Sequence, residues 1–246
     1  MKPLLTDPQL QQKAIALHNL LCVEYGCPID YFHSLDPLSE LVSSLLSHRT
    51  RNHDSGKAFK QLVARFPTWE MVCDAPTAEI EQAIAPCTWP EQKAPRIQQV
   101  LRLIGEKTGG EWSLEFLQAM SVTDARAWLE ALPGVGPKTS AAVLCFSRLR
   151  LKALPVDSHH HRVAQRVGLI STKVAVGPSH QALESLLPEN WNAQQVYDHH
   201  EVMMLHGQKC CYYRNPACDR CVIAQLCNYR KAALDKITDE RQLGSV

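Results

Sequence analysis

Residues 132–149, LPGVGPKTSAAVLCFSRL, contain the turn that decides the fold. One predicted helix ends near Leu132, residues 133–136 reverse the chain, and Pro137 suits the first position of the next helix. Two glycines in the turn permit positive φ angles and leave backbone N–H groups exposed at a helix N-terminus. Such donors suit a phosphate oxygen, bound directly or through a cation, and a glycine-rich corner without a ligand is the alternative. The backbone predicted to face the phosphate is that of Gly134, Val135 and Gly136.

The rest of the chain repeats its apolar residues with a helical period. Within residues 38–50 they recur at helical spacing, at Leu38, Leu41, Val42, Leu45 and Leu46. Similar patterns occupy residues 56–66, 78–85, 94–107 and 123–132, and clusters of Pro, Gly, Asp or Thr separate them. No convincing alternation of period two is found. The sequence therefore predicts an all-α protein of short helices joined by short loops.

Composition narrows the class of protein. The 246 residues suffice for one large domain or two small ones, and 26 Lys and Arg nearly cancel 25 Asp and Glu. That balance argues against nucleic-acid binding through bulk charge and leaves a local basic face open. The N-terminus resembles no signal peptide, and no stretch approaches the roughly 18 apolar residues that span a membrane. We therefore expect a protein of the reduced cytosol.

Ten cysteines are the second strong signal. In a reduced compartment, metal binding or reactivity explains them better than disulfides. Four of them, Cys211, Cys218, Cys221 and Cys227, have the spacing C-x6-C-x2-C-x5-C and suit either zinc or a [4Fe–4S] cluster. Cys210 adjoins the first of these and is expected to be a spare thiol. Burial as small apolar residues is expected for Cys22, Cys27, Cys73, Cys87 and Cys145.

Two charged residues are candidates for chemistry. Lys138, near the start of the second hairpin helix, is either a solvated lysine or a nucleophile that attacks a sugar C1′ and forms a Schiff base. The nucleophilic role requires a lowered pKa, from desolvation or a nearby cation. Asp157 precedes a predicted helix that Gly168 ends, so its carboxylate is expected to cap that helix. The same carboxylate could stabilise positive charge that develops on a sugar ring.

Three segments resemble one family of DNA repair enzymes. LPGVGPKTSAAVL (132–144), LPVDSHHHRV (154–163) and LHGQKCC (205–211) with the cysteines that follow resemble the endonuclease III family of helix-hairpin-helix DNA glycosylases, in the family's order. The resemblance covers nearly the whole chain. It implies that Lys138 is the Schiff-base lysine of a bifunctional glycosylase/lyase and that Asp157 is its paired aspartate. It also implies that the four spaced cysteines bind a [4Fe–4S] cluster.

The resemblance further points to residues that would contact DNA around an extruded nucleotide. Where the family usually has LLS-x-Q this chain has Arg49, and where it usually has a leucine wedge this chain has Trp89. Trp89 is either an intercalating wedge or a core aromatic, and Arg49 either contacts an orphaned base and phosphate or pairs with a carboxylate such as Asp54. Arg214, between the first two cluster cysteines, is predicted to face a DNA backbone. His206 suits orienting the cluster loop more than binding the metal.

The predicted architecture is an all-α, two-domain helix-hairpin-helix glycosylase fold. Residues 39–149 would form a six-helix domain with the hairpin. Residues 1–38 and 150–246 would form a discontinuous iron–sulfur cluster domain, with the cluster loop at 211–227. The expected partner is double-stranded DNA with a damaged base or an abasic site. We expect a monomer with no membrane association, in the cytoplasm at the nucleoid.

The expected activity is base excision repair by a DNA glycosylase with AP lyase activity. A damaged base would be removed and the strand nicked by β-elimination through a Schiff base on Lys138. One alternative is a monofunctional mismatch or damaged-base glycosylase that uses Asp157 and water. Another is a sensor that binds damaged DNA without cutting it. A zinc-stapled form of the cysteine loop is a third possibility.

Overall fold

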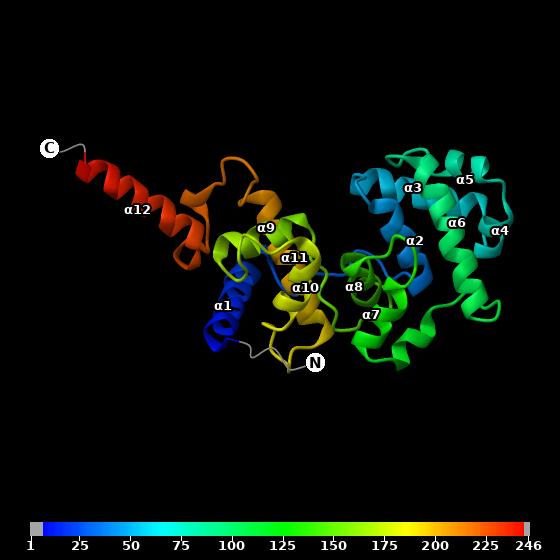
Figure 1. Ribbon diagram of the computed structural model, residues 1–246, viewed down its shortest axis with the longest axis horizontal. Coiled ribbons are helices and arrows are strands. Elements are labelled where there is room, and N and C mark those ends of the chain that lie inside the picture. The colour runs from blue at the N-terminus through cyan, green and yellow to red at the C-terminus, as the bar shows by residue number, and fades with distance from the viewer. Residues whose placement is uncertain (1–6, 244–246) are drawn as a thin grey trace. The chain divides into compact units, whose positions relative to one another are not determined.

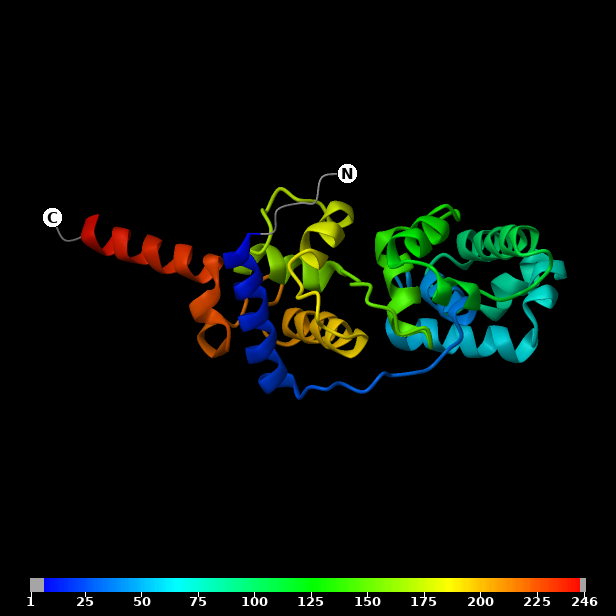
Figure 2. The same cartoon turned by 90° about the horizontal axis from the view of Figure 1, so that it is seen from below.

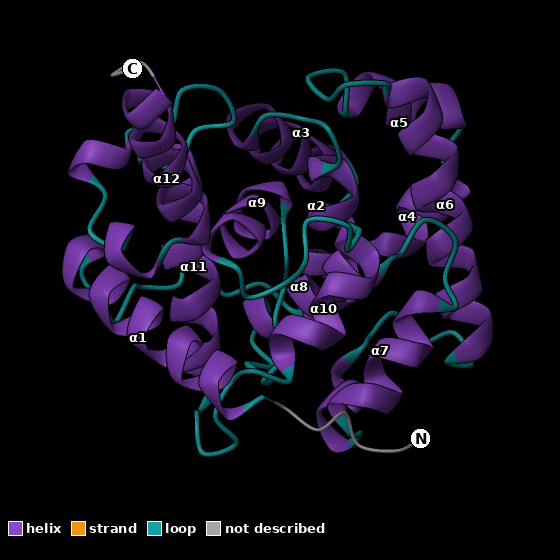
Figure 3. Ribbon diagram, turned by 60° about the vertical axis from the view of Figure 1, so that its left-hand side comes forward, coloured by secondary structure: helices purple, strands orange, loops and turns teal. Residues whose placement is uncertain are grey.

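The computed structural model describes the backbone of residues 7–243 and the side chains of residues 7–235 (Figure 1). Its contacts divide the chain into two units, Tyr31–Ala153 and a discontinuous unit of Met1–Asp30 with Leu154–Val246. Throughout residues 7–243 the regular structure is helical, without a strand, which confirms the predicted all-α class (Figure 3). In that same range each helix is too short or too polar to cross a membrane. The expectation that the N-terminus is not a signal peptide concerns a segment whose first residues, 1–6, lie outside the described part.

The unit Tyr31–Ala153 is built around α2, which spans Pro37–Ser47. Its predicted apolar face is buried, and Leu38, Leu41 and Leu46 are 0% exposed. This face packs against three other helices, α3, α6 and α8. The remaining elements are α3 (Asn52–Arg65), α4 (Trp69–Asp74), α5 (Thr77–Ala83), α6 (Pro90–Lys107), the 3-10 helix η1 (Glu115–Ala119), α7 (Val122–Glu130) and α8 (Pro137–Phe146).

The predicted hairpin joins α7 to α8. Pro137 is the first residue of α8, as predicted, and Val135 is buried in the core of this unit. The N–H of Val135 donates to the carbonyl of Leu132 at 3.2 Å and closes the turn. Gly134 has φ +82°, whereas Gly136 has an extended backbone with φ −110°. Of the two glycines that permit a positive φ, only Gly134 uses it, because a single left-handed residue suffices to reverse the chain.

The discontinuous unit is built around α11, Ala193–Lys209, which packs against α1 and α9 (Figure 2). Buried apolar residues from all three helices form its core, among them Leu17, Val163 and Val202. The other elements of this unit are α1 (Pro8–Tyr25), α9 (Ser158–Val167), α10 (Val176–Glu184), the 3-10 helices η2 (Cys218–Arg220) and η3 (Ala224–Leu226), and α12 (Asn228–Leu243). The short 3-10 turns lie in the cysteine-rich loop.

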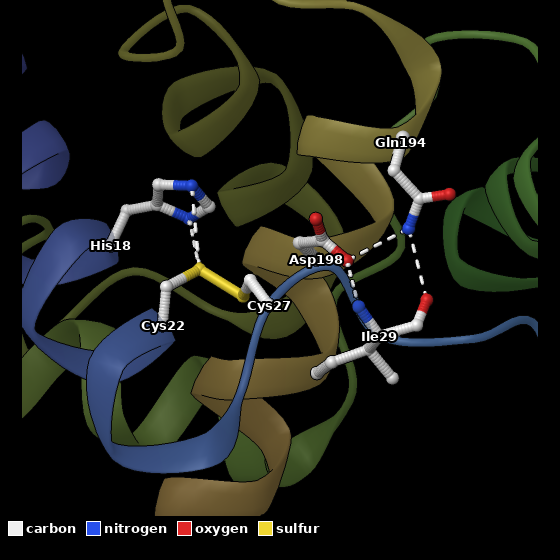
Figure 4. The surroundings of a disulfide bond; sticks show 6 residues. All are labelled: His18, Cys22, Cys27, Ile29, Gln194 and Asp198. Carbon is white, nitrogen blue, oxygen red and sulfur yellow. Dashed lines mark hydrogen bonds between the residues drawn. A yellow bond between two sulfur atoms is a disulfide. The ribbon is translucent and has the colours of Figure 1, made fainter.

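A disulfide at the end of α1 corrects the predicted role of two cysteines. Cys22 and Cys27 are bonded to each other and are not merely buried small residues (Figure 4). The physical reason is the end of α1: Gly26 adopts a left-handed conformation, and the N–H groups of Gly26 and Cys27 both donate to the carbonyl of Cys22. This turn brings the two Cα atoms to 4.9 Å, within disulfide range. The predicted burial is confirmed for three others, Cys73, Cys87 and Cys145.

Candidate functional site

Lys138 is the second residue of α8 and is half-buried. The next residue, Thr139, is buried, and its hydroxyl lies 2.9 Å from Nε2 of His48. Partial burial lowers the pKa of His48 to about 4, and the charges of Lys138 and Lys93 add to the effect. At neutral pH the imidazole beside Lys138 is therefore uncharged.

Two loops of the same unit present Arg49 and Trp89, and both residues have a left-handed backbone, with φ +51° and +55°. Residues other than glycine adopt this conformation at a cost of about 1 kcal/mol or more, and such strain concentrates at functional sites. Trp89 is 46% exposed, so it is not a core aromatic. The carboxylate of Asp54 lies 3.1 Å from the ring of His53, and within the described side chains Arg49 has no ion pair.

Lys93 fixes these two loops relative to each other. Its ammonium group donates to the carbonyls of Leu46 and His48, at 2.6 and 2.8 Å, and to the hydroxyl of Thr50 at 2.7 Å. That hydroxyl also accepts the N–H of Thr88 at 3.1 Å. The ammonium group of Lys93 thus binds the chain on both sides of Arg49. No sequence pattern predicted this role.

Arg49 and Trp89 line one cavity of about 450 Å³ together with Gly134 of the hairpin. None of its lining residues is acidic: Leu45, His48, Arg49, Trp89, Gln92, Lys93, Arg96, Ile97 and Gly134. The side chain of Arg96 lies against Gly134, where a Cβ would come within 2.8 Å of its Nη1. Three basic side chains around one concave surface make it suited to an anion.

Asp157 lies in the other unit and caps α9, as predicted. Its carboxylate accepts the N–H of His160 at 2.7 Å, and Gly168 ends the helix with φ +82°. The side chain of Asp157 is half-buried. Lys138 and Asp157 are therefore contributed by different units of the chain.

Behind Asp157, α11 buries four successive polar residues that sequence reasoning missed, Asp198, His199, His200 and Glu201. Burial, together with the charges of Asp157 and Asp198, raises the pKa of Glu201 to about 7. The signal was present in the sequence: a helix turns through a full circle in four residues, so the run DHHE must place some of its polar side chains inside.

Five thiols line a second cavity, in the discontinuous unit. They are Cys210, Cys211, Cys218, Cys221 and Cys227. The other lining residues include apolar ones and two arginines but no carboxylate. Soft thiolates in an apolar wall are the donor set that an iron–sulfur cluster requires. Because Cys210 lines the same cavity, the choice of Cys211 as a ligand stays a prediction.

The sequence predicts that His206 orients the cysteine loop and that Arg214 faces a DNA backbone. His206 is buried, with Nε2 3.5 Å from Sγ of Cys221 and Nδ1 3.1 Å from the hydroxyl of Tyr25. Among the described residues, His206, Cys210 and Cys221 bring their ligand atoms within 4.8 Å of one another. Arg214 is exposed at the surface of the loop.

Two arginines of α9 hold the cysteine loop. Arg162 donates to the carbonyl of Cys211 at 3.0 Å. Arg166 donates to the carbonyl of Tyr212 at 2.6 Å and to Sγ of Cys211 at 3.3 Å. Helix α9, which Asp157 caps, is therefore hydrogen-bonded to the segment that carries Cys211, the first predicted cluster ligand.

Comparison with known proteins identifies the family. The profile of the HhH-GPD superfamily of base excision DNA repair proteins matches residues 42–193, and that of the iron–sulfur binding domain of endonuclease III matches residues 214–227. Endonuclease III of Thermotoga maritima is 32% identical over 195 residues, which are 79% of this chain and 84% of the relative. The chain belongs to the endonuclease III family.

Further relatives agree with this assignment. Endonuclease III of Escherichia coli K12 is 30% identical over 195 residues, 79% of this chain and 85% of that one. A trapped endonuclease III–DNA covalent intermediate superposes with a TM-score of 0.76 at 24% identity, over 91% of this chain and 98% of that one. A thermostable thymine-DNA glycosylase gives 0.74 at 23%, over 92% and 100%. These structures have the same fold.

Membership of the endonuclease III family confirms the main predictions from the sequence. The chain is a base-excision-repair DNA glycosylase with the helix-hairpin-helix fold, and it acts on DNA. Its cysteine-rich segment is an iron–sulfur binding domain that binds a [4Fe–4S] cluster. The profile of that domain covers Cys218, Cys221 and Cys227.

Proposed function

We propose that this enzyme removes a damaged base from double-stranded DNA and then cuts the abasic strand, with Lys138 as nucleophile and Asp157 as its partner. The observation that carries the proposal is a lysine in the first turn of α8, directly after the hairpin turn, in a member of the endonuclease III family. The N-terminus of that helix offers N–H donors to a phosphate. Lys138 would thus act beside a bound DNA backbone.

The chemistry follows from an amine and a carboxylate. Nζ of Lys138 forms a bond to C1′ as the glycosidic bond breaks and its electron pair leaves with the base. Opening of the sugar ring and loss of a proton from nitrogen give an imine. Removal of a proton from C2′ then breaks the C3′–O bond, and the 3′ phosphate leaves. Asp157 stabilises the positive charge that develops on the sugar and accepts or returns protons.

Double-stranded DNA is the proposed substrate form. The cavity of Arg49, Trp89 and Arg96 supports this because an exposed tryptophan can enter a base stack while arginines contact phosphate or base edges. Gly134, Val135 and Gly136 would supply backbone N–H groups, and Arg214 a further phosphate contact. We propose that the unit Tyr31–Ala153, which has seven α-helices, corresponds to the hairpin domain predicted at residues 39–149, and that the other unit is the cluster domain. The enzyme is further proposed to act as a monomer at the nucleoid.

The cluster has a structural part in this proposal. Cys211, Cys218, Cys221 and Cys227 would hold it, and when bound it supplies iron–sulfur bonds that cross-link a segment of short 3-10 turns. Arg162 and Arg166 fix the backbone of the loop from α9. The loop would then present Arg214 in a fixed position.

Borohydride trapping tests the proposal. Reduction of the imine on a duplex with an abasic site should give a covalent protein–DNA adduct. The adduct should disappear in Lys138→Ala and persist in Lys152→Ala, an exposed lysine of the same unit that serves as the matched control. A wild-type enzyme that releases bases but never forms the adduct would support a monofunctional reaction with Asp157 and water instead.

A further inference from the structure

The peptide group between Pro155 and Val156 is bound by two buried histidines, one at its carbonyl and one at its N–H. Nδ1 of His200 lies 2.8 Å from the carbonyl of Pro155, and the N–H of Val156 donates to Nε2 of His180 at 3.1 Å. His200 belongs to α11 and His180 to α10, and they are 3% and 2% exposed. Two different helices thus hold the segment that leads into Asp157.

The contacts of His180 fix its tautomer. Its Nδ1 lies 3.0 Å from the carbonyl of Val176 and 3.2 Å from that of Gly177. Carbonyls only accept hydrogen bonds, so Nδ1 carries the proton and Nε2 is left to accept the N–H of Val156. A charged His180 would lose this bond because both ring nitrogens would then be donors.

His200 binds the same peptide group as a donor. The carbonyl of Pro155 only accepts, so Nδ1 of His200 carries a proton. Its Nε2 faces Glu201, whose Oε1 is 4.0 Å away. One histidine therefore accepts from the peptide N–H while the other donates to the peptide carbonyl.

Asp157 is held from its other side as well. Its carboxylate accepts the N–H of His160, the third residue of α9. Further back along the chain, the N–H of Leu154 donates to Oε1 of Glu184 in α10 at 3.1 Å. Helix capping alone would orient the carboxylate toward α9, but it does not require two buried histidines and a half-buried glutamate along the segment that precedes it. Burying such groups is costly unless they are satisfied, so their presence calls for a purpose beyond packing.

We propose that His180 and His200 are positioning residues for Asp157: they hold the Pro155–Val156 peptide group at both its N–H and its carbonyl, and so fix the direction of the carboxylate that follows. The inference rests on the proposed role of Asp157. It adds a pair of buried side chains from α10 and α11 that act on Asp157 through the backbone. A carboxylate that stabilises a transition state must be held to within a fraction of an ångström, and a rigid backbone provides this.

Paired substitutions test the inference. His200→Leu removes the donor to Pro155, whereas His200→Asn keeps an N–H close to the place of Nδ1. His180→Leu removes the acceptor for Val156, whereas His180→Gln keeps an oxygen close to the place of Nε2. The readouts are the single-turnover rate of base removal, the Kd for a duplex with an uncleavable tetrahydrofuran abasic analogue, and the visible absorbance of the cluster.

The leucine variants should lower the single-turnover rate on the order of 10- to 100-fold, the scale of a misplaced catalytic group. Their Kd for the tetrahydrofuran duplex and their cluster absorbance should match the wild type. The asparagine and glutamine variants should recover most of the rate. Leucine variants that fold, load the cluster and keep the wild-type rate would overturn the inference. Should a leucine variant not fold, His180→Asn replaces it, because the side-chain oxygen of asparagine does not reach the N–H of Val156. A lowered single-turnover rate in this variant supports the inference, and a wild-type rate overturns it.

Asp157→Asn separates this inference from the proposed function. If that variant keeps the wild-type rate of base removal, the role of Asp157 is wrong and the positioning role with it. If Asp157→Asn is inactive while the histidine variants react like the wild type, the positioning role alone is wrong.

Discussion

Glu201 is a buried carboxyl whose pKa, about 7, lies well above its ordinary value of 4.5. The folded protein therefore binds a proton that the unfolded chain gives up between these two pH values. Stability should consequently fall as pH rises from about 4.5 and level off above about 7, by up to about 3 kcal/mol. Three groups facing Glu201 carry charge or titrate, namely Asp157, Asp198 and His200.

Glu201→Gln has the shape of the protonated carboxyl and cannot ionise. We expect the variant to unfold at a higher temperature than the wild type at pH 8 and at nearly the same temperature at pH 5. Circular dichroism melts at the two pH values provide the measurement. An equal difference at both pH values, or a loss of stability at pH 8, would show that folding does not raise the pKa of Glu201.

At the scale of elements, the hairpin turn makes unequal demands on its two glycines. Gly134 has φ +82° and its Cβ position is 2.8 Å from the side chain of Arg96, whereas Gly136 is extended with open space around it. Gly134→Ala should therefore destabilise the fold by about 1 kcal/mol or more, and Gly136→Ala should be close to neutral. Urea denaturation of both variants measures the difference. Equal losses would contradict the assigned backbone geometry.

The end of α1 gives a prediction about thiols. With Cys22 and Cys27 paired, eight of the ten cysteines should react with iodoacetamide after denaturation and removal of the cluster without a reductant. All ten should react after reduction, and peptide mapping should assign the two additional sites to residues 22 and 27. Ten reactive thiols before reduction would show that this disulfide is absent.

At the scale of the whole molecule, sequence patterns predicted what depends on local chemistry. The helical period of apolar residues predicted α2, and the preferences of proline and aspartate for helix starts predicted that α8 begins at Pro137 and that Asp157 caps α9. Each of these features depends on residues within one or two turns. The expectation that cysteines of a reduced compartment are unpaired was wrong for Cys22 and Cys27, because their pairing depends on the left-handed turn at Gly26.

Contacts between distant segments were the part that the sequence could not predict. Lys93 holds a loop more than forty residues earlier in the chain. The histidines behind Asp157 come from α10 and α11, and the left-handed conformations of Arg49 and Trp89 contradict the ordinary preference of both residue types. Each of these features is set by tertiary packing, for which a local pattern carries no signal.

The central claim is that Lys138, contributed by one unit, and Asp157, contributed by the other, act on the same nucleotide. Mass spectrometry of the borohydride-reduced adduct, after protease and nuclease digestion, tests it most directly. The account predicts the sugar remnant on Nζ of Lys138 and a much lower yield of this peptide from Asp157→Asn. A remnant on another amine, or an undiminished yield without the carboxylate of Asp157, would contradict it.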